Sequence, residues 1–504
     1  MLPLLESQAY LAALYNDEAA YQREIMQARR YDAGQQFVAL TARLRMFLGG
    51  DANDNSADYA RLRLNVCRIV LSSVVDRLIL AGMDSDERPV QTRDPGGDMR
   101  TVKPVAAWAW RVWQQNRMDA KQRAVHEAVL RDSEAFVLVD WDNTKKRPRF
   151  TPHQRYVDGN GGGDNDGCKA FYRNDDPDQD LLFVTKRWSE VVYSGTSRTT
   201  RQRLTIYYPD RIEKYAGMPG AWQRVSDDPS EPWPIPWRHR DGTPLGIPVA
   251  HGRSSAGMEA REAWPLQNAI NKVFVDLMAE SDIAAFRILA AFGWKPVDSR
   301  GNPLPIEPGT WVGSENQNGK IQEISGADLS QFLNVIDSLM FKVATVTDTP
   351  VSRFIVTKQV AAEGSQKEQS GPLLNKIRNR SGELGNMWED AFSIARRLEN
   401  TFGAGGLDET AQLSAQWEPL EARDEVAEIA KAEAYDRLGL PLALIARVLG
   451  LTPEETAAWQ AEKDRRASVA AQTFGGMNDR SNQDSSGAGG MPAAVGASGG
   501  GNAV

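Results

Sequence analysis

The sequence contains few of the residues that build metal or redox sites, with two cysteines and four histidines among 504 residues. Cys67 and Cys168 are too few for a disulfide framework or a four-thiolate metal site, and Cys67 lies in an apolar run typical of a buried free thiol. The histidines are scattered, without the spacing of metal ligands, at His126, His153, His239 and His251. We therefore expect no metal site, and a chain suited to a reducing cytoplasm.

Excess positive charge and long apolar runs are also missing. Lysine and arginine together number 59, against 67 aspartates and glutamates, which gives a net charge of −8. This balance argues against a protein that grips nucleic-acid phosphates over a broad basic surface. No window of about 18 apolar residues suggests a membrane span. Residues 1–10 lack the basic flank and apolar core of a signal peptide, so we expect no membrane association.

The signatures of nucleotide binding and hydrolysis are incomplete. A phosphate-binding loop places four residues between two glycines and follows the second with Lys-Ser or Lys-Thr. Here Gly313 and Gly319 are separated by five residues, and Lys320 is followed by Ile321. No Gly-x-Ser-x-Gly elbow occurs, and solvated helix faces explain the paired carboxylates. We predict a protein without catalytic residues or cofactor, so that an enzyme of nucleic-acid processing is the less favoured alternative.

One loop is similar to a calcium-binding loop. It runs from Asp158 to Gly167, but Gly162 stands where an oxygen ligand belongs and Lys169 stands where the closing glutamate belongs. A solvated loop is the favoured interpretation, with a weak cation site as the alternative.

What the sequence does contain is a pattern of helix, break and helix. Residues 328–346 carry apolar side chains at three- and four-residue steps, with Asp328 as N-cap and Gln331 as its capping-box partner. The residue before Pro350 is pushed out of the helical region, which ends the first helix. After a polar segment, a long amphipathic helix is predicted to resume at about Pro372. Its apolar side comprises Leu373, Ile377, Leu384, Met387, Trp388, Ala391, Ala395 and Leu398.

This order, with Thr-Asp-Thr-Pro-Val-Ser-Arg-Phe at 347–354 and Met-Trp-Glu-Asp-Ala-Phe at 387–392, resembles the portal proteins of tailed bacteriophages, in the group typified by actinobacterial phages. In that family a stem helix leads into a loop that projects into a central channel, and a long helix returns outward. A second region has a similar Ile-Pro-Val strand, Gly-Arg-Ser turn and Pro-Leu-Gln-x-x-x-Asn helix start. The matching residues are Gly246, Pro248, Val249, Gly252, Arg253, Ser254, Pro265, Leu266, Gln267 and Asn271.

The N-terminal half is predicted to begin with helices. One should run from Leu4 to about Arg30, with a stop at residues 31–34, and another from 58 to 82, ending at Gly82. A third should span Pro104 to about Asp132. Its tryptophans cannot all share one helical face, so a subunit contact and core packing are both open for Trp108, Trp110 and Trp113.

Later segments change character several times. Residues 135–215 are rich in β-branched and aromatic residues and predict strands, and the proline-rich residues 232–237 predict an extended strap. The breakers of 291–327 predict a small, mostly extended module. Residues 411–417 suggest one strand, and 424–470 a pair of helices with a capping box at Thr452 and Glu455. From about Phe474 the chain is Gly, Ser, Asn and Ala, and we expect disorder.

The resemblance implies an α+β, mainly helical subunit of portal type, which assembles into a ring of about twelve copies by head-to-tail contacts. The implied regions are a wing at 1–258, a first stem helix at 259–290, a clip at 291–327, a second stem helix at 328–346, a channel loop at 347–371, a long wing helix and returning strand at 372–423, a crown at 424–473 and a disordered tail at 474–504.

The implied function is that of a portal at the unique capsid vertex, assembled in the host cytoplasm and carried in the virion. Double-stranded DNA would pass through it during packaging and ejection, and an acidic wall would keep the polymer mobile. The expected partners are terminase, scaffold, major capsid protein and head-tail adaptor. A structural capsid component without a channel is the alternative. Sequence-independent DNA contacts are expected from Lys358, Gln359, Glu363, Ser365, Gln366, Lys367 and Glu368.

Overall fold

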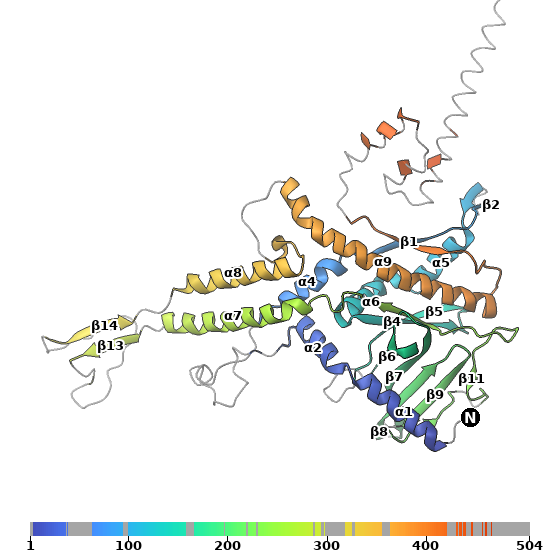
Figure 1. The fold of residues 1–504 in the computed structure, drawn as a ribbon, viewed down its shortest axis with the longest axis horizontal. Helices are drawn as coiled ribbons and strands as arrows, with labels where there is room; N and C mark the ends of the chain where they lie inside the picture. The colour runs from blue at the N-terminus through green and yellow to red at the C-terminus, as the bar shows by residue number, and fades with distance from the viewer. Residues whose placement is uncertain are drawn as a thin grey trace, which may run out of the picture. The chain divides into compact units, whose positions relative to one another are not determined.

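The chain folds into helices and strands, with helices predominating, which confirms the α+β class. It divides into two compact units, residues 1–88 with 103–420 and residues 89–102 with 421–504. In the second unit, β2 (Val90–Arg93) pairs antiparallel with β3 (Met99–Val102). The elements below belong to the first unit (Figure 1). The computed structural model describes residues 4–36, 38, 63–93, 99–157, 166–195, 197–217, 220–227, 230–285, 288–293, 297, 318–324, 328–354, 363–420 and scattered positions between 430 and 465.

Strand β4 (Glu134–Asp142) is central to the first unit because its two faces meet different cores. It pairs antiparallel with β5 (Arg147–Gln154) on one side and with β12 (Val249–Arg253) on the other. Successive side chains of a strand point to opposite faces. Val137 and Val139 therefore join the cluster formed with the helices, while Phe136 and Leu138 join a cluster shared with a second sheet.

The second sheet confirms the prediction of strands in residues 135–215. Its antiparallel order is β10-β9-β8-β7-β6, and β11 also pairs with β9. The expected strap at 232–237 is extended and contributes β11 to this sheet. The bounds are β6 Gly167–Tyr172, β7 Leu181–Ser194, β8 Ser197–Tyr207, β9 Arg211–Gly217, β10 Gln223–Arg224 and β11 Ile235–Pro236, with a short 3-10 turn, η2, at Arg173–Asp175.

Two helices occupy the N-terminal region where one was predicted. α1 (Leu4–Ala19) and α2 (Gln22–Asp32) are separated by a break at residues 20–21. Leu11 and Leu14 of α1 are buried in a cluster with residues of the second sheet. α2 ends at the predicted stop, where Gly34 has a φ of +66°, a value that a residue without Cβ adopts readily.

The tryptophan-rich region is also two helices rather than one. α5 (Pro104–Gln115) and α6 (Met118–Asp132) are separated by Asn116 and by Arg117, whose φ is 54°. The Asn116 amide donates to the carbonyls of Val112 at 2.9 Å and Pro148 at 3.0 Å, which fixes the corner against β5. Core packing is the correct interpretation for two of the tryptophans, because Trp108 and Trp113 are buried.

The predicted helix at 58–82 is wrong at its C-terminal end, and residues 63–65 lie before the helix, with Asn65 as its N-cap. α4 spans Val66–Val75, and residues 80–85 form β1 (Leu80–Ser85), with Gly82 inside the strand. β1 pairs antiparallel with β15 (Leu413–Trp417), which confirms the strand predicted at 411–417. The apolar run fits both a helix and a strand, and its pairing partner lies more than 300 residues away, where local periodicity carries no information.

The two helices with intervening extended structure form a long hairpin (Figure 1). After the turn η3 (Arg261–Ala263), α7 (Trp264–Ala285) packs against α8 (Leu329–Val346). Between them, β13 (Ile288–Phe292) pairs antiparallel with β14 (Lys320–Ile324). The helix predicted at 259–290 is therefore wrong at both limits, because α7 begins at Trp264 and residues 288–290 belong to β13. Extended structure is confirmed at residues 291–292 and 320–324 of the predicted module. Asp328 is the N-cap of α8, but its carboxylate accepts from the Ser330 N–H at 2.9 Å instead of from Gln331.

The long C-terminal helix begins earlier than predicted. α9 spans Glu363–Phe402 and contains Pro372 in its interior. A proline removes one backbone donor and normally breaks a helix. Here the eight apolar positions predicted from periodicity are all buried in the described core, and α9 packs on β4 and β12. This extensive packing stabilises the helix on the C-terminal side of the proline.

Several predictions fall outside the described residues. These are most of the glycine-rich loop at 158–167, residues 301–317 of the breaker-rich module, the helix pair with its capping box at Thr452 and Glu455, and the C-terminal tail.

Candidate functional site

The residues predicted to contact DNA lie between α8 and the first turns of α9. Lys358 and Gln359 lie outside the described residues. The structure places the other five in the helical backbone at the start of α9, and it does not describe their side chains. These five are Glu363, Ser365, Gln366, Lys367 and Glu368. The segment between the two helices is therefore shorter than predicted, and its two ends can be described.

The first end of this segment is a tightly bonded turn after α8. The Thr347 hydroxyl donates to the Val343 carbonyl at 2.7 Å, and the Thr349 N–H donates to the Ala344 carbonyl at 3.0 Å. Asp348 between them has a φ of 48°, the left-handed conformation that reverses the chain. Both threonines are buried, so the turn itself is held in the body.

The turn is held from α9 by a lysine. Lys376 Nζ donates to the Thr347 carbonyl and forms an ion pair of 2.8 Å with Glu259. Arg380, one helical turn further on, also contacts Glu259, at 3.2 Å. The Glu259 side chain is 3% exposed, and a carboxylate removed from water in this way requires paired cations. The Glu259 carboxylate thus connects the residues before α7 to α9. Through Lys376, it is also linked to the turn at the end of α8.

A second contact holds the turn to α4. Arg353 lies in the short helix η4 (Val351–Arg353), and its Nε donates to the Ser73 hydroxyl at 3.2 Å. Its guanidinium also lies 3.5 Å from Asp76. The conspicuous motif at 347–354 therefore anchors the start of the inter-helix segment to two helices of the body.

The Pro-Leu-Gln-x-x-x-Asn motif anchors the start of α7. Gln267 and Asn271 are one helical turn apart, so they share a face, and both are buried. The side-chain Oε1 of Gln267 accepts from the Val66 N–H at 2.6 Å, and Asn271 Oδ1 accepts from the Leu64 N–H at 3.0 Å. These side chains satisfy backbone donors at the start of α4. The motif could be recognised in the sequence only by its similarity to a known family. No local pattern predicted that its side chains form hydrogen bonds with the start of α4.

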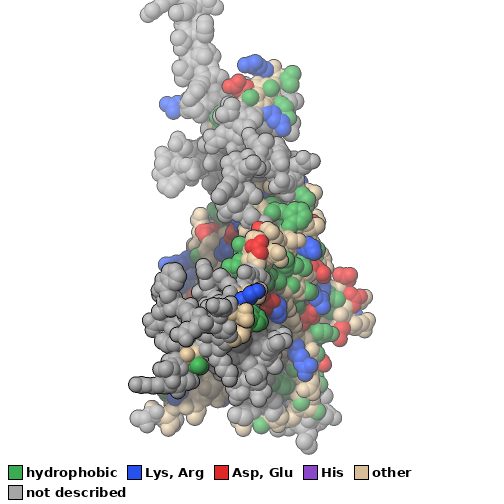
Figure 2. Space-filling model, turned by 90° about the vertical axis from the view of Figure 1, so that its left-hand side faces the viewer, with side chains coloured by type: hydrophobic (Ala, Val, Ile, Leu, Met, Phe, Trp, Pro, Cys, Tyr) green, Lys and Arg blue, Asp and Glu red, His purple; other side chains and the backbone are tan. Residues whose placement is uncertain are grey.

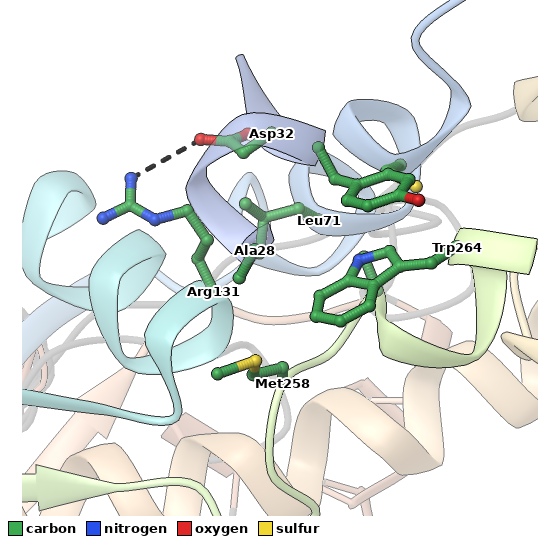
Figure 3. Close-up of a pocket in the computed structure, with 9 residues that line it drawn as sticks. Ala28, Asp32, Leu71, Arg131, Met258 and Trp264 are labelled. Atoms are coloured by element: carbon green, nitrogen blue, oxygen red, sulfur yellow. Dashed lines mark hydrogen bonds and ion pairs between the residues drawn. The ribbon is translucent and has the colours of Figure 1, made fainter. Parts of the chain in front are cut away.

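The same junction encloses a small cavity (Figure 3). Tyr31 stacks on Trp264 with ring centroids 5.0 Å apart, and Arg131 reaches Asp32 at 3.5 Å. The cavity volume is about 10 Å³, room for one water molecule at most. Burial raises the pKa of the Cys67 thiol beside it to about 12, so this thiol is not a nucleophile. The junction is a packing site, too small for a substrate.

α8 exposes apolar side chains on both sides of the face that packs towards α7. The packed face includes Ile336 and Val343, which are buried. At 3.6 residues per turn, Leu333 and Phe341 lie on one side of that face, and Val335 and Val346 lie on the other. A soluble helix normally turns polar residues outward. Instead, the exposed positions include four large apolar residues with exposed fractions of 46–58%. They are Leu333, Val335, Phe341 and Val346.

The helix pair carries few charged residues, and these are of both signs. Asp337 and Lys342 are the charged residues of α8, and on α7 Lys272 pairs with Asp276. The described surface in Figure 2, viewed from the side of β13 and β14, intersperses basic, acidic and hydrophobic side chains. Such a surface does not concentrate phosphate-binding charge.

The described residues contain no group of three His, Cys, Asp or Glu side chains arranged to hold a metal ion. The same residues include no helix with the length and hydropathy of a membrane span. His126 is a core residue, whose Nδ1 lies 2.9 Å from the Leu78 carbonyl.

An antiparallel helix pair with a β-hairpin between its helices, rooted in a layered α+β body, defines a structural subunit. Residues 98–468 match the family model described as phage portal protein, SPP1 Gp6-like. The chain therefore belongs to this family of phage portal proteins. It is 24% identical over 216 residues to the portal protein of Mycobacterium phage D29, and 25% identical over 211 residues to that of Mycobacterium phage L5. Each match covers 39% of this chain and 41% of the relative's length.

Proposed function

We propose that this chain is the subunit of a portal ring at one capsid vertex, through which double-stranded DNA enters and leaves. The observation that carries the proposal beyond family membership is the set of exposed apolar side chains on the two sides of α8, Leu333 and Phe341 on one and Val335 and Val346 on the other. Burying a Val, Leu or Phe side chain contributes about 1.5–3 kcal/mol. Repeated head-to-tail contact between identical subunits would remove these side chains from water and close a ring, of about twelve copies as the family implies.

Within this proposal each region has a role. α7 and α8 are the two stem helices, and the module at 291–327 is the clip that docks packaging and tail machinery. The body at 1–258 and the residues 372–423 form the wing, and 424–473 the crown. The layered sheets and the α7–α8 pair support the division between body and stem.

The segment at 347–371 is proposed as the channel loop. Its start is held by Thr347 and Arg353, and Lys376 holds that turn from α9. With this start anchored, the segment that contains Lys358 and Gln359 and the first turns of α9, which contain Glu363 to Glu368, would face the passing duplex. Their contacts are proposed to be with phosphates and independent of base sequence.

The proposed partners are terminase, scaffold, major capsid protein and head-tail adaptor. The ring assembles in the host cytoplasm and becomes part of the virion. Energy for packaging comes from a separate ATPase, because we assign this chain no catalytic role. The helix pair carries two lysines against four aspartates and glutamates, and this net negative charge suits a conduit, since strong phosphate binding would oppose DNA movement.

Electron microscopy of the purified full chain tests the function. Rings with a central hole are the expected result. Compact monomers at all protein concentrations would overturn it, and monomers that hydrolyse ATP would support the packaging-enzyme alternative. Closed shells or sheets without a hole would support a capsid component with no channel.

A further inference from the structure

A groove lies beside α2, next to the start of α7. It has a volume of about 490 Å³ and is lined by Arg23, Met26, Gln27, Arg30, Tyr31, Gln36 and Asn268. Arg23, Gln27 and Arg30 share one helical face, at steps of four and three residues. Arg23 and Arg30 are exposed and lie about 10 Å apart along the helix axis, given a rise of about 1.5 Å per residue.

The two arginines are available for a partner. Neighbouring charges on α2 are engaged, since Arg29 pairs with Asp132 at 2.8 Å and Asp32 pairs with Arg68 at 2.6 Å. In the part of the chain that the structure describes, neither Arg23 nor Arg30 has an ion-pair partner. The groove is therefore a basic feature on an acidic chain, and guanidinium groups bind carboxylates or phosphates.

The side-chain amide of Gln36 favours a carboxylate-bearing peptide over a phosphate as the ligand of the groove. Its side chain is 2% exposed and lines the groove, yet both its amide nitrogen and its carbonyl oxygen lack a hydrogen-bond partner. A buried amide left without partners is destabilising. A phosphate offers only acceptors and would leave the Gln36 oxygen unpaired, whereas a peptide group offers both a donor and an acceptor. The chemistry of the groove thus matches a backbone segment that carries carboxylates.

The chain itself supplies such segments. The turn between β6 and β7 is exposed and carries Asp175, Asp176, Asp178 and Asp180, of which Asp180 pairs with Arg173 at 3.2 Å. In a closed head-to-tail ring, every copy must present both halves of the contact. A basic groove and acidic turns on one chain satisfy that requirement.

We propose that the α2 groove receives an acidic backbone segment of a second copy of this chain. The inference rests on the ring assembly proposed above, and it adds a polar contact in the body to the apolar contact along α8. The arginines bind the neighbour's carboxylates, and Gln36 forms hydrogen bonds with its peptide group.

Sedimentation velocity of the full chain over a range of protein and salt concentrations tests this contact. The double variant Arg23→Glu/Arg30→Glu is compared with Arg111→Glu/Lys121→Glu, which makes the same charge change at exposed positions of α5 and α6. We expect the groove variant to need at least tenfold more protein for half-assembly, and the control to assemble as the wild type does. Added salt should weaken wild-type assembly.

Gln36→Leu provides an independent measurement. It removes an amide that is unpaired in the single chain, so the monomer should melt at the same temperature or higher. Assembly should nevertheless weaken several-fold, because the contact to the neighbour's peptide group is lost. A merely structural Gln36 would leave assembly unchanged.

The outcomes separate the two proposals. A wild-type protein that never forms rings overturns the portal function and this contact with it. Rings formed equally well by the wild type and the groove variants overturn only the contact. A lower monomer melting temperature with normal assembly would place the groove's partner in the same chain. Loss of binding to a duplex oligonucleotide with normal assembly would assign the groove to nucleic acid, and both results reject the proposal.

Discussion

At the residue scale, His126 links stability to pH. Its ring is fully buried between α6, α9 and the chain before β1. Trp388 Nε1 donates to His126 Nε2 at 2.9 Å, so Nε2 carries no proton, and Nδ1 donates to the Leu78 carbonyl at 2.9 Å. Burial lowers the pKa of His126 to about 4, from an ordinary value of 6.5. The folded chain therefore holds the neutral ring.

We predict that His126 makes the folded state lose stability as pH falls from about 6.5 to 4. Over that range the unfolded chain binds a proton that the folded chain rejects. The loss should reach about 3 kcal/mol, from about 1.4 kcal/mol per pKa unit. Urea unfolding at several pH values checks this, with His126→Gln and His126→Asn expected to make the profile less steep. Burial also lowers the pKa of His153 and of His251 to about 3, so these two residues keep part of the slope in both variants.

His239→Gln is the control for the His126 variants. His239 Nδ1 contacts the Thr401 hydroxyl at 2.9 Å, and its replacement should leave the pH slope close to that of the wild type. An unchanged slope in both His126 variants would show that another group governs the pH dependence.

The apolar side of α9 was predictable residue by residue, but the polar partners were not. Leu373, Ile377 and the other apolar positions follow from helical periodicity alone. The bond between Trp388 and His126 joins residues 262 positions apart. No local pattern contains such a pairing, since it depends on how α9 lies across α6. For the same reason, no local pattern predicts that the buried side-chain amide of Gln36 lacks a hydrogen-bond partner.

At the element scale, the start of α7 is held by side chains rather than by backbone pairing. Gln267 bonds to the backbone at Leu64 and Val66, and Asn271 Oδ1 also accepts from Gln267 Nε2 at 3.1 Å. These contacts fix the angle at which α7 leaves the body.

We predict that Gln267→Met destabilises the folded chain by about 2–4 kcal/mol. Methionine keeps the volume but leaves the Val66 N–H and the Leu64 carbonyl buried without partners, at about 1–3 kcal/mol each. Urea unfolding of the monomer measures the change. Gln331→Met makes the same substitution at an exposed position of α8 and should stay within about 0.5 kcal/mol. Equal effects of the two variants would show that the α7 anchor contributes nothing.

The existence of elements was easier to predict than their limits. Strands in 135–215 follow from composition, and the helices predicted at 259–290 and 328–346 exist as α7 (Trp264–Ala285) and α8 (Leu329–Val346). The helix predicted through Gly82 becomes a strand because β15 pairs with it, and α9 continues through Pro372 because its later turns are packed on two strands. Both errors arise where tertiary contacts outweigh local propensity.

At the scale of the whole molecule, the proposed channel loop can be separated from the assembly. We predict that Lys358→Glu/Lys367→Glu impairs DNA packaging or retention without affecting ring formation. Reversed charge in the channel would repel phosphates, while the anchors at Thr347 and Arg353 remain in place. DNA content per particle and electron microscopy of the rings measure the two effects.

Lys121→Glu/Lys145→Glu is the matched control for the loop variant, because both lysines are exposed on the body. It should package normally. Full DNA content in particles built with the loop variant would remove the proposed role of the two lysines. Loss of rings in that variant would instead place the loop in a subunit contact.

The exposed apolar side chains of α8 are expected to be buried only when subunits assemble. Phe341 is 58% exposed and Val346 is 51% exposed, so replacing either by serine should leave the stability of the monomer nearly unchanged. In a ring each would be buried against a neighbour, at about 1.5–3 kcal/mol for a side chain. We therefore predict that Phe341→Ser and Val346→Ser each raise the concentration for half-assembly by about 10- to 100-fold, since about 1.4 kcal/mol is tenfold. Tyr193→Ser removes an aromatic ring that is 71% exposed on β7, away from the helix pair, and should assemble normally. If all three variants form rings at wild-type concentrations, the exposed apolar side chains of α8 do not lie in the contact between subunits. The ring would then have to close through contacts of the body alone.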